Sequence, residues 1–314
     1  MSRRNFRKLN GILLLDKPLG ASSNKVLQDV RFLFQAAKAG HTGSLDPLAS
    51  GMLPVCFGEA TKVSAFLLDA DKTYITTAQL GAVSDTGDAE GVLSEPQPVP
   101  EFSVADIEAV LERFRGDIDQ VPPMYSALKK DGQPLYKLAR QGVEIERQAR
   151  PVTIHDLVLQ DYSADTLSLS VRCSKGTYIR TLVEDIGNAL GCGAYVAMLR
   201  RTEVSPFNGL PMHTPDSLRE RFGQGGLEAL DELLLPLDCA LPHLPELMLS
   251  DEHLLRLRQG QRLSVREFAE LLPETTVING GLVRVYEQTG QSPLFAGLCE
   301  VEGAALKPKR LLAY

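Results

Sequence analysis

The chain has 314 residues, of which 44% are apolar and 23% are charged, as is usual for a globular protein. No apolar run approaches the roughly 18 residues needed to cross a bilayer, and the first apolar stretch, Gly11 to Leu15, is too short for a signal-peptide core. These features exclude membrane and secreted proteins. Five scattered cysteines without a C-x-x-C pair favour a cytoplasmic protein without disulfides.

The net charge of −7 argues against a nucleic-acid partner, but the charge is unevenly distributed. Residues 215–252 hold nine acidic and two basic residues, and this difference of seven accounts for the whole excess. Residues 123–150 carry six basic residues against three acidic ones. Further bases lie near the two ends, at Arg3, Arg4 and Arg7 and at Lys307, Lys309 and Arg310. Such segregation allows a basic face despite an acidic total.

Hydrophobic periodicity and turn residues predict alternating strands and helices over the first 200 residues. The predicted elements are, in chain order, a strand at 11–15, a helix from about 22 to 35, a polar loop at 39–51, a strand at 52–57, a helix at 59–68, a strand at 73–80, a helix starting at 103, a short helix at 135–141, a strand at 167–173, a helix at 177–190 and a strand at 194–204. This order predicts one α/β or α+β unit of catalytic size.

The remainder of the chain differs in composition. Leucine-rich acidic helices are predicted for 215–238. Short strands are predicted at 276–278, 282–286, 294–301 and 310–312. These strands indicate a small β-rich appendage that begins near residue 247.

The glycine-rich loop around Asp46 is the most unusual segment. Pro47 has a fixed φ and restricts Asp46 to an extended conformation, so that the carboxylate lies on a stiff bend. The glycines around it, Gly40, Gly43, Gly51 and Gly58, would allow a ligand to approach the backbone. The pattern is typical of a nucleophile or a base. The alternative is a turn in which Asp46 caps the next segment.

A competing motif follows at Asp69-x-Asp71-x-Thr73, preceded by hydrophobic residues. It resembles the phosphotransferase signature of haloacid-dehalogenase-like enzymes, in which the first aspartate, here Asp69, attacks phosphate beside Mg²⁺. That motif requires a strand before Asp69, whereas the apolar spacing before it is helical, and no later motif supplies the remaining metal carboxylates. The five histidines are dispersed without an H-x-x-x-H pattern, so no protein-built metal site is predicted.

The third segment, Ser174-Lys-Gly-Thr-Tyr178-Ile-Arg180-Thr, leads from a strand through a glycine turn into a helix. Arg180 lies off the apolar stripe of that helix. Its guanidinium is either solvated or paired with a buried carboxylate that it keeps ionised and oriented. A tyrosine such as Tyr178 is more often a core residue than a ligand contact.

Four motifs together resemble the TruB family of bacterial tRNA pseudouridine-55 synthases. They are Gly11-Ile-Leu-Leu-Leu-Asp-Lys17-Pro18, Gly40-His-Thr-Gly-Ser-Leu-Asp46-Pro47, Lys72-Thr-Tyr74 and the segment containing Tyr178 and Arg180. The resemblance runs in order from about residue 9 to 205 and is weaker over 206–314, where the family usually has a small PUA-like RNA-binding domain.

The resemblance implies an α+β fold. A pseudouridine synthase catalytic domain, with a mostly antiparallel mixed sheet flanked by helices, is expected over residues 1–246 and a PUA-like domain over 247–314. The implied reaction isomerises the uridine at position 55 of the tRNA T-arm, with no cofactor and no metal. We expect a monomer that needs no protein partner. Segment 123–150, which contains Tyr125 and Tyr136, is the candidate RNA-gripping insertion.

The resemblance also assigns roles to individual residues. Asp46 is the nucleophile, Arg180 is its ion-pair partner, and Tyr74 stacks on the uracil that is flipped out of the loop. The remaining assignments are Tyr178 and Leu199 as walls around the base, His41 as the residue that fills the vacated space in the T-loop, and Lys17 as a support of the active-site loop. The residues leave open whether Asp46 attacks C1′, attacks C6 or acts as a base toward a glycal intermediate.

Two further alternatives remain at this stage. One is an RNA-binding protein of the same fold that assists tRNA folding without turnover. The other is a relative of the same family that modifies a different RNA.

Overall fold

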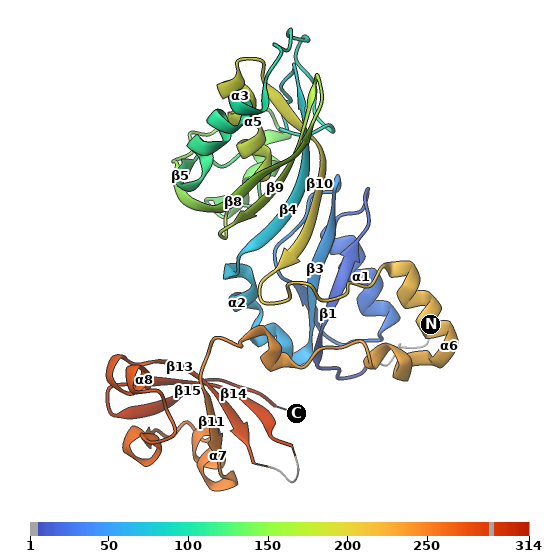
Figure 1. The fold of residues 1–314 in the computed structure, drawn as a ribbon. Helices are drawn as coiled ribbons and strands as arrows, with labels where there is room; N and C mark the ends of the chain where they lie inside the picture. The colour runs from blue at the N-terminus through green and yellow to red at the C-terminus, as the bar shows by residue number, and fades with distance from the viewer. Residues whose placement is uncertain (1–5, 289–291, 314) are drawn as a thin grey trace.

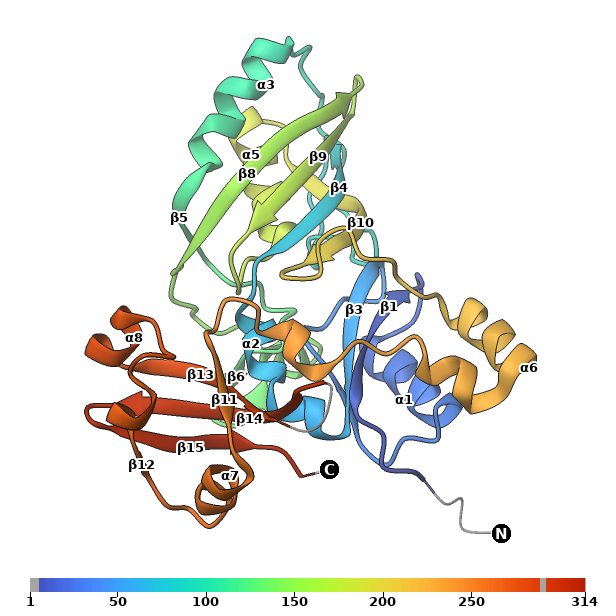
Figure 2. The same ribbon diagram turned by 60° about the horizontal axis from the view of Figure 1, so that its bottom comes forward.

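The structure is a computed structural model that describes residues 6–288 and 292–313 (Figure 1). Two sheets organise the chain, one of eight strands and one of five, and a small two-stranded sheet accompanies them. Figures 1 and 2 show the five-stranded sheet as a separate unit beside one end of the larger sheet. Every helix among the described residues is too short or too polar to span a bilayer.

The larger sheet has the strand order β1-β3-β10-β4-β9-β8-β5, and β2 pairs with β3 off this path. Its strands are β1 (Gly11–Lys17), β2 (Ala39–His41), β3 (Ala49–Phe57), β4 (Lys72–Leu80), β5 (Gly116–Gln120), β8 (Arg150–Tyr162), β9 (Thr166–Cys173) and β10 (Ala194–Val204). The pairing of β10 with β3 is parallel, and the other pairings of this sheet are antiparallel. The expected mostly antiparallel mixed sheet is therefore confirmed.

Strand β10 joins the two halves of this sheet. It pairs with β4 along almost its whole length, from Ala194 opposite Leu80 to Val204 opposite Lys72. Its pairing with β3 covers Leu199–Arg201 only, opposite Ala49–Gly51. The half containing β1 and β3 is thus attached to the half containing β4, β9, β8 and β5 by a short parallel seam (Figure 1).

Helices cover the sheet where the strands present apolar faces. Helix α1 begins after Ser22, whose side chain accepts from the Lys25 amide, and α5 ends at Gly191 with a φ of +84°, a conformation that favours glycine. Helix α3 begins with the capping box that the sequence suggests between Ser103 and Asp106. The helices are α1 (Ser23–Leu33), α2 (Ser64–Asp69), α3 (Val104–Leu111), α4 (Leu135–Ala139), α5 (Ile179–Leu190) and α6 (Pro215–Asp231).

The C-terminal unit has its own core. Its sheet has the order β11-β13-β14-β15-β12, and a cluster of buried leucines and valines, among them Leu247, Val283 and Leu306, fills one face. A second apolar cluster joins this unit to the larger sheet, because Phe295 and Leu298 share it with Ile12 and Met52. The elements are β11 (Glu246–Leu249), α7 (Asp251–Arg258), β12 (Leu263–Ser264), α8 (Glu274–Asn279), β13 (Gly281–Glu287), β14 (Leu294–Glu302) and β15 (Ala305–Leu311).

Several sequence predictions differ from the structure. The polar loop predicted at 39–51 begins with strand β2 and ends with the first residues of β3. Residues 276–278, predicted as a strand, belong to helix α8, which lies between Pro273 and Gly280. The predicted helix at 59–68 is a 3₁₀ turn, Gly58–Lys62, followed by the short helix α2. Strand β8 was not predicted, although it is the longest strand at 13 residues, because much of it is exposed and its alternation is interrupted.

Candidate active site

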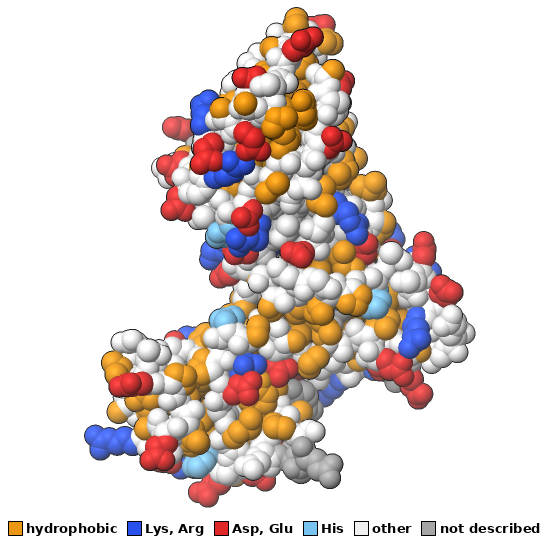
Figure 3. Space-filling model, viewed as in Figure 1, with side chains coloured by type: hydrophobic (Ala, Val, Ile, Leu, Met, Phe, Trp, Pro, Cys, Tyr) orange, Lys and Arg blue, Asp and Glu red, His pale blue; other side chains and the backbone are white. Residues whose placement is uncertain are grey.

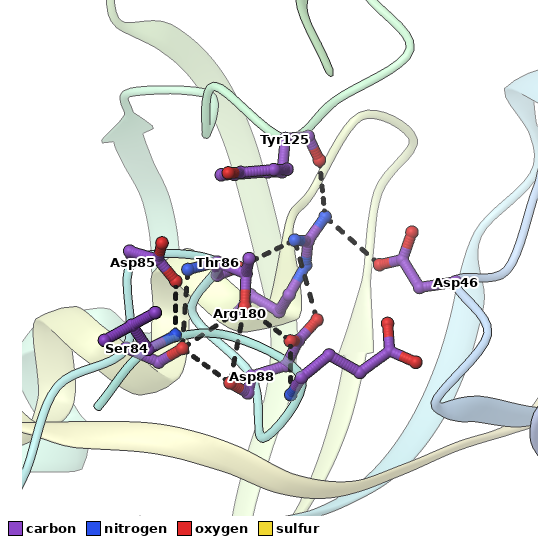
Figure 4. A network of polar contacts seen from close by, with 9 residues as sticks. Asp46, Ser84, Asp85, Thr86, Asp88, Tyr125 and Arg180 are labelled. Atoms are coloured by element: carbon purple, nitrogen blue, oxygen red, sulfur yellow. Dashed lines mark hydrogen bonds and ion pairs between the residues drawn. The ribbon is translucent and has the colours of Figure 1, made fainter. Parts of the chain in front are cut away.

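Asp46 and Arg180, 134 residues apart in the sequence, meet at the seam of the sheet. The Asp46 Oδ2 atom lies 3.1 Å from Nη2 of Arg180. The Arg180 side chain is only 8% exposed, whereas that of Asp46 is 45% exposed. The pairing expected from the resemblance is present (Figure 4), and the Asp46 side chain remains partly accessible.

Arg180 is held by more than Asp46. Its Nη1 donates to the Thr86 carbonyl and its Nη2 to the Tyr125 carbonyl, both at 2.7 Å. The carboxylate of Asp88, itself buried, lies 3.7 Å from Nη1 (Figure 4). The guanidinium therefore has a fixed orientation, and the alternative of a solvated arginine is wrong.

The loop that carries Asp88 fits closely against Arg180. Gly87 has a φ of +76°, and a Cβ atom there would lie 3.1 Å from the Cβ of Arg180. The Asp88 carboxylate accepts from the Thr86 hydroxyl at 2.6 Å and from the Glu90 amide at 3.1 Å. A second carboxylate is thus built into the site beside the first.

Asp46 is surrounded by opposing electrostatic influences. Partial desolvation by the surrounding chain raises its pKa above the ordinary value, and the negative charge of Asp88 acts in the same direction. Arg180 and, more weakly, Lys17 lower the pKa. The two cations therefore stabilise the ionised carboxylate in a place where desolvation would favour the neutral acid.

Lys17 supports the bend that carries Asp46. Its side chain is fully buried, and its ammonium donates to the carbonyls of Ala21 at 2.7 Å, Pro18 at 2.9 Å and Pro47 at 3.4 Å. Burial lowers the pKa of Lys17 to about 8, opposed by the charge of Asp46. The contact with Pro47 places this cation against the residue that follows Asp46.

Tyr74 and Leu199 lie on the two central strands of the sheet, β4 and β10. Both side chains are 8% exposed and belong to one apolar cluster, which also contains Ala49 at the start of β3. Burial raises the pKa of Tyr74, and nearby Asp46 raises it further. The Tyr74 hydroxyl is therefore kept protonated in the free protein.

Tyr178 precedes helix α5 and is held by a residue that the sequence did not indicate. The Gln120 side chain accepts from the Tyr178 amide at 2.7 Å and donates to the Tyr178 carbonyl at 3.1 Å. Gln120 is 2% exposed. This double contact fixes the backbone just before Arg180.

His41 ends the short strand β2, two residues before Gly43. Its Nδ1 atom is buried without a hydrogen-bond partner among the described residues. Burial, together with the charge of Arg201, lowers the pKa of His41, so that its imidazole is neutral at pH 7. The imidazole is thus partly enclosed by the protein rather than fully solvated.

The glycines around Asp46 have a different use from the one expected. A Cβ atom at Gly51 would lie 2.1 Å from the Arg201 carbonyl, and one at Gly58 would lie 2.2 Å from the Leu9 carbonyl. At these two positions glycine permits close packing of backbone on backbone rather than the approach of a ligand.

Asp69 lies in the wrong context for a phosphotransferase. It ends helix α2 rather than following a strand, its side chain is 64% exposed, and it pairs with Lys175 at 2.9 Å. Within the residues that the structure describes, no three His, Cys, Asp or Glu side chains are grouped as metal ligands. The requirement for a strand that delivers Asp69 is contradicted, and we drop this alternative.

The candidate RNA-contacting bases differ in availability. Arg3 and Arg4 lie outside the described residues, and Arg7 forms a double contact with Asp231 at 2.5 Å. Lys309 pairs with Glu300 at 2.9 Å, and Lys307 pairs with Glu302. On the face shown in Figure 3, Lys and Arg side chains are scattered among acidic ones.

Segment 123–150 presents its bases more openly. It contains a small hairpin, β6 (Lys129–Lys130) with β7 (Gln133–Pro134), followed by α4. Five of its six basic side chains are exposed, namely Lys129, Lys130, Lys137, Arg140 and Arg150. At its base the Tyr125 carbonyl accepts from Arg180, so this segment is attached directly to the site.

Sequence reasoning did not assign roles to Asp88, Gln120 or Arg201. The glycine in Asp85-Thr86-Gly87-Asp88 is a signal of a tight loop, but residue types alone do not place that loop beside Arg180.

The fold is that of a pseudouridylate synthase, and comparison with known proteins makes this assignment specific. Residues 31–179 match the model of the N-terminal domain of TruB family pseudouridylate synthases. Residues 180–242 and 245–312 match two C-terminal models of the same family. The chain belongs to the TruB family.

Relatives support this assignment over nearly the whole chain. The chain is 52% identical to tRNA pseudouridine synthase B of Pseudomonas fluorescens (strain Pf0-1), covering 99% of this chain and 98% of the relative. It is 51% identical to the protein of the same name from Pseudomonas aeruginosa (strain UCBPP-PA14), with the same coverage.

Solved structures share the fold. A chain in the crystal structure of a Cbf5-Nop10-Gar1 complex matches with a TM-score of 0.71 at 26% identity, covering 96% of this chain and 84% of that one. A chain in the archaeal box H/ACA sRNP Nop10-Cbf5 complex matches with a TM-score of 0.69 at 23% identity, covering 97% and 86%, and this match supports the fold alone.

Proposed function

We propose that this protein is a tRNA pseudouridine synthase that isomerises the uridine at position 55 in the T-arm of tRNA. Its membership of the TruB family and the name shared by relatives about half identical to it support this proposal. The observation that carries the mechanism is the half-exposed Asp46 carboxylate bound on one side to the buried guanidinium of Arg180.

The reaction breaks the N1–C1′ bond of uridine, turns the uracil and joins C5 to C1′. The proton on C5 is released and N1 gains one, so the reaction requires no oxidant or reductant. Asp46 acts as the ionised nucleophile, or as the base of a glycal route. Arg180 holds it in that state, because it supplies a fixed positive charge where burial would otherwise favour protonation.

The other side chains of the site receive and orient the base. Tyr74 stacks on the extruded uracil, and Tyr178 and Leu199 bound the space beside it. His41 fills the space in the T-loop that the flipped base leaves, and its imidazole does so in the neutral form. Lys17 keeps the Asp46 bend in place through the Pro47 carbonyl.

The RNA contacts extend over both parts of the chain. We assign residues 1–246 to the catalytic domain and 247–314 to a PUA-like RNA-binding domain. Segment 123–150 grips the RNA through its exposed bases. The enzyme acts as a monomer on tRNA in the cytoplasm without a protein partner, cofactor or metal; its five unpaired cysteines are typical of a reducing compartment.

The test uses a T-arm hairpin whose uridine 55 carries a label on C5, because isomerisation releases that hydrogen. Asp46→Asn is expected to reduce release by more than about 10³-fold while the Kd for the hairpin stays within about twofold. The matched control is Asp29→Asn on α1, where the carboxylate forms an exposed pair with Lys25 at 2.6 Å, and it should keep the wild-type rate.

Three outcomes would contradict parts of the proposal. Release by Asp46→Asn at the wild-type rate would remove the nucleophile assignment. A wild-type protein that binds and folds the hairpin without releasing the label would favour an RNA-folding protein. Label release from a uridine of a different RNA, with little from the T-arm, would change the substrate.

A further inference from the structure

Arg201 is the largest fully buried side chain of the described residues, with 1% of its surface exposed. No carboxylate lies in ion-pair contact with it in the part of the chain that the structure describes. Its hydrogen bonds are to carbonyls, from Nε to Met52 at 2.7 Å and from Nη2 to Gly43 at 3.0 Å. A buried cation without a counter-ion is costly, so its presence here needs a reason.

The two carbonyls that Arg201 binds lie on either side of Asp46. Gly43 precedes Asp46 by three residues and Met52 follows it by six. The guanidinium therefore ties the loop before Asp46 to the strand β3 that follows it, across the segment 43–52. Gly43 has a φ of +79°, a conformation that favours glycine, and its Cα lies close enough to Arg201 that an added Cβ atom would be in van der Waals contact with Nη1, at 3.5 Å.

Arg201 also adjoins Tyr74. The two residues are register partners on β10 and β4, and directly opposed residues of antiparallel strands place their side chains on the same face. The guanidinium and the phenol interact closely enough for Arg201 to lower the pKa of Tyr74, against the larger effect of burial. The Arg201 side chain thus contacts both the segment that carries Asp46 and the Tyr74 ring, which in the proposed function stacks on the uracil.

We propose that Arg201 is a positioning residue for the isomerisation, which holds the Asp46 loop and the Tyr74 ring in one fixed relative geometry. The role rests on the proposed function. Arg201 itself does not touch the RNA, since it is fully covered by β3, β4 and the 43–52 loop. It acts through the two groups that do, and a displacement of either by about 1 Å is enough to lower the rate strongly.

Two substitutions test this role. Arg201→Gln removes the charge and one of the two carbonyl contacts, and Arg201→Lys keeps the charge but loses the fork that spans Gly43 and Met52. We expect single-turnover release of the C5 label to fall about 100-fold for glutamine and about tenfold for lysine, with the Kd for the hairpin within about twofold of wild type.

The neighbouring arginine supplies the control. Arg200 lies on the same strand, points to the opposite face and pairs with Asp16 at 2.8 and 2.9 Å. Arg200→Lys should keep the wild-type single-turnover rate at saturating RNA. Melting temperatures of all variants are measured alongside, and if Arg201→Gln does not fold, Arg201→Lys alone decides the question.

A double-mutant cycle with Tyr74→Phe separates positioning from a purely structural contribution. If Arg201 acts partly through the tyrosine hydroxyl, the effect of Arg201→Lys shrinks in the Tyr74→Phe background. Strictly multiplicative effects, wild-type rates for both Arg201 variants, or losses that only follow the melting temperature would overturn the inference. A wild-type protein inactive on every RNA tested would instead overturn the proposed function.

Discussion

The two sheets of this protein use charge in different ways. In the eight-stranded sheet, the cations Lys17, Arg180 and Arg201 are buried and donate largely to backbone carbonyls. In the C-terminal sheet, the ion pairs Arg258–Glu287 and Lys309–Glu300 lie at the surface, and the buried cation Arg284 is paired with Glu246 at 2.9 Å in addition to its bond to the Leu244 carbonyl. The comparison teaches that, among the described residues, a buried cation with carbonyl partners and no ion-paired carboxylate, such as Lys17 or Arg201, is found beside the candidate site, whereas the C-terminal unit gives its buried cation a carboxylate, which lowers the cost of burial.

The largest effect expected on the catalytic side is that of Arg180→Lys. Lysine keeps the charge but cannot reach Asp46, Asp88 and two carbonyls at once. The single-turnover rate on the T-arm hairpin should fall about 10²–10³-fold, with the Kd for RNA unchanged. Arg172→Lys on β9, where the arginine pairs with the exposed Asp156 at 2.5 Å, is the control. A loss of rate of less than tenfold for Arg180→Lys would mean that a positive charge at position 180 is enough for the reaction without the guanidinium geometry.

The C-terminal side is probed by Leu298→Ala at the junction of the two sheets. Leu298 is fully buried, so the substitution should lower the free energy of unfolding by about 2–5 kcal/mol, measured by urea denaturation. Leu306→Ala, inside the C-terminal core, should cost a similar amount. Neither should change the rate on a short hairpin below the melting range. A rate that falls with Leu298→Ala while the protein stays folded would erase the contrast between the two regions.

The pH dependence of the reaction tests the electrostatics of Asp46. Its pKa is raised by burial, and the reaction requires the ionised form. The single-turnover rate should therefore fall about tenfold per pH unit on the acidic side, beginning above the ordinary carboxyl value of about 3.9. A rate independent of pH down to about 4 would show that the surrounding cations outweigh burial.

The lowered pKa of Lys17 predicts that the free energy of unfolding depends on pH. Its pKa is about 8 in the folded protein and 10.5 ordinarily, so between these values the unfolded chain binds more protons and the free energy of unfolding rises with pH. This lysine should contribute a rise of about 2 kcal/mol from about pH 7.5 to 9.5, which Lys17→Met removes. Urea denaturation at the two pH values measures the difference. An equal rise in both proteins would assign it to other groups, Lys72 among them.

The smallest effect is expected at Asp69. Asp69→Asn removes an exposed pair with Lys175 and should leave the isomerisation rate within twofold. EDTA should also leave the rate unchanged, because the proposed reaction requires no metal. Inhibition by EDTA that added Mg²⁺ reverses would show that metal is needed, at least for the RNA to adopt its folded form.

Local patterns were sufficient to predict several elements. The alternation at 73–80 corresponds to β4, and the apolar stripe before Gly191 corresponds to α5. Residues 276–278 were mispredicted because β-branched residues favour strands in isolation, whereas Pro273 and Gly280 bound a helix there. Tertiary packing decides whether such short segments form a helix or a strand.

The residues of the site also divide into those that the sequence reveals and those that it does not. Asp46 and Arg180 were identified because their motifs are local, and the pairing followed from the resemblance. Arg201 was not identified, because its partners are the backbone carbonyls of Gly43 and Met52. Every residue has such a carbonyl, so the sequence does not show which ones a buried arginine will bind. A contact between a side chain and distant backbone leaves no pattern in residue types.

The short pairing of β10 with β3 has a consequence for how the molecule holds its substrate. Asp46 belongs to one half of the large sheet, while Tyr74 and Arg180 belong to the other, and three residues of parallel strand join the halves. A nucleotide seated between these side chains would contact both halves at once, so substrate binding is expected to stabilise the join by mass action. The arrangement of the candidate catalytic residues depends on this join.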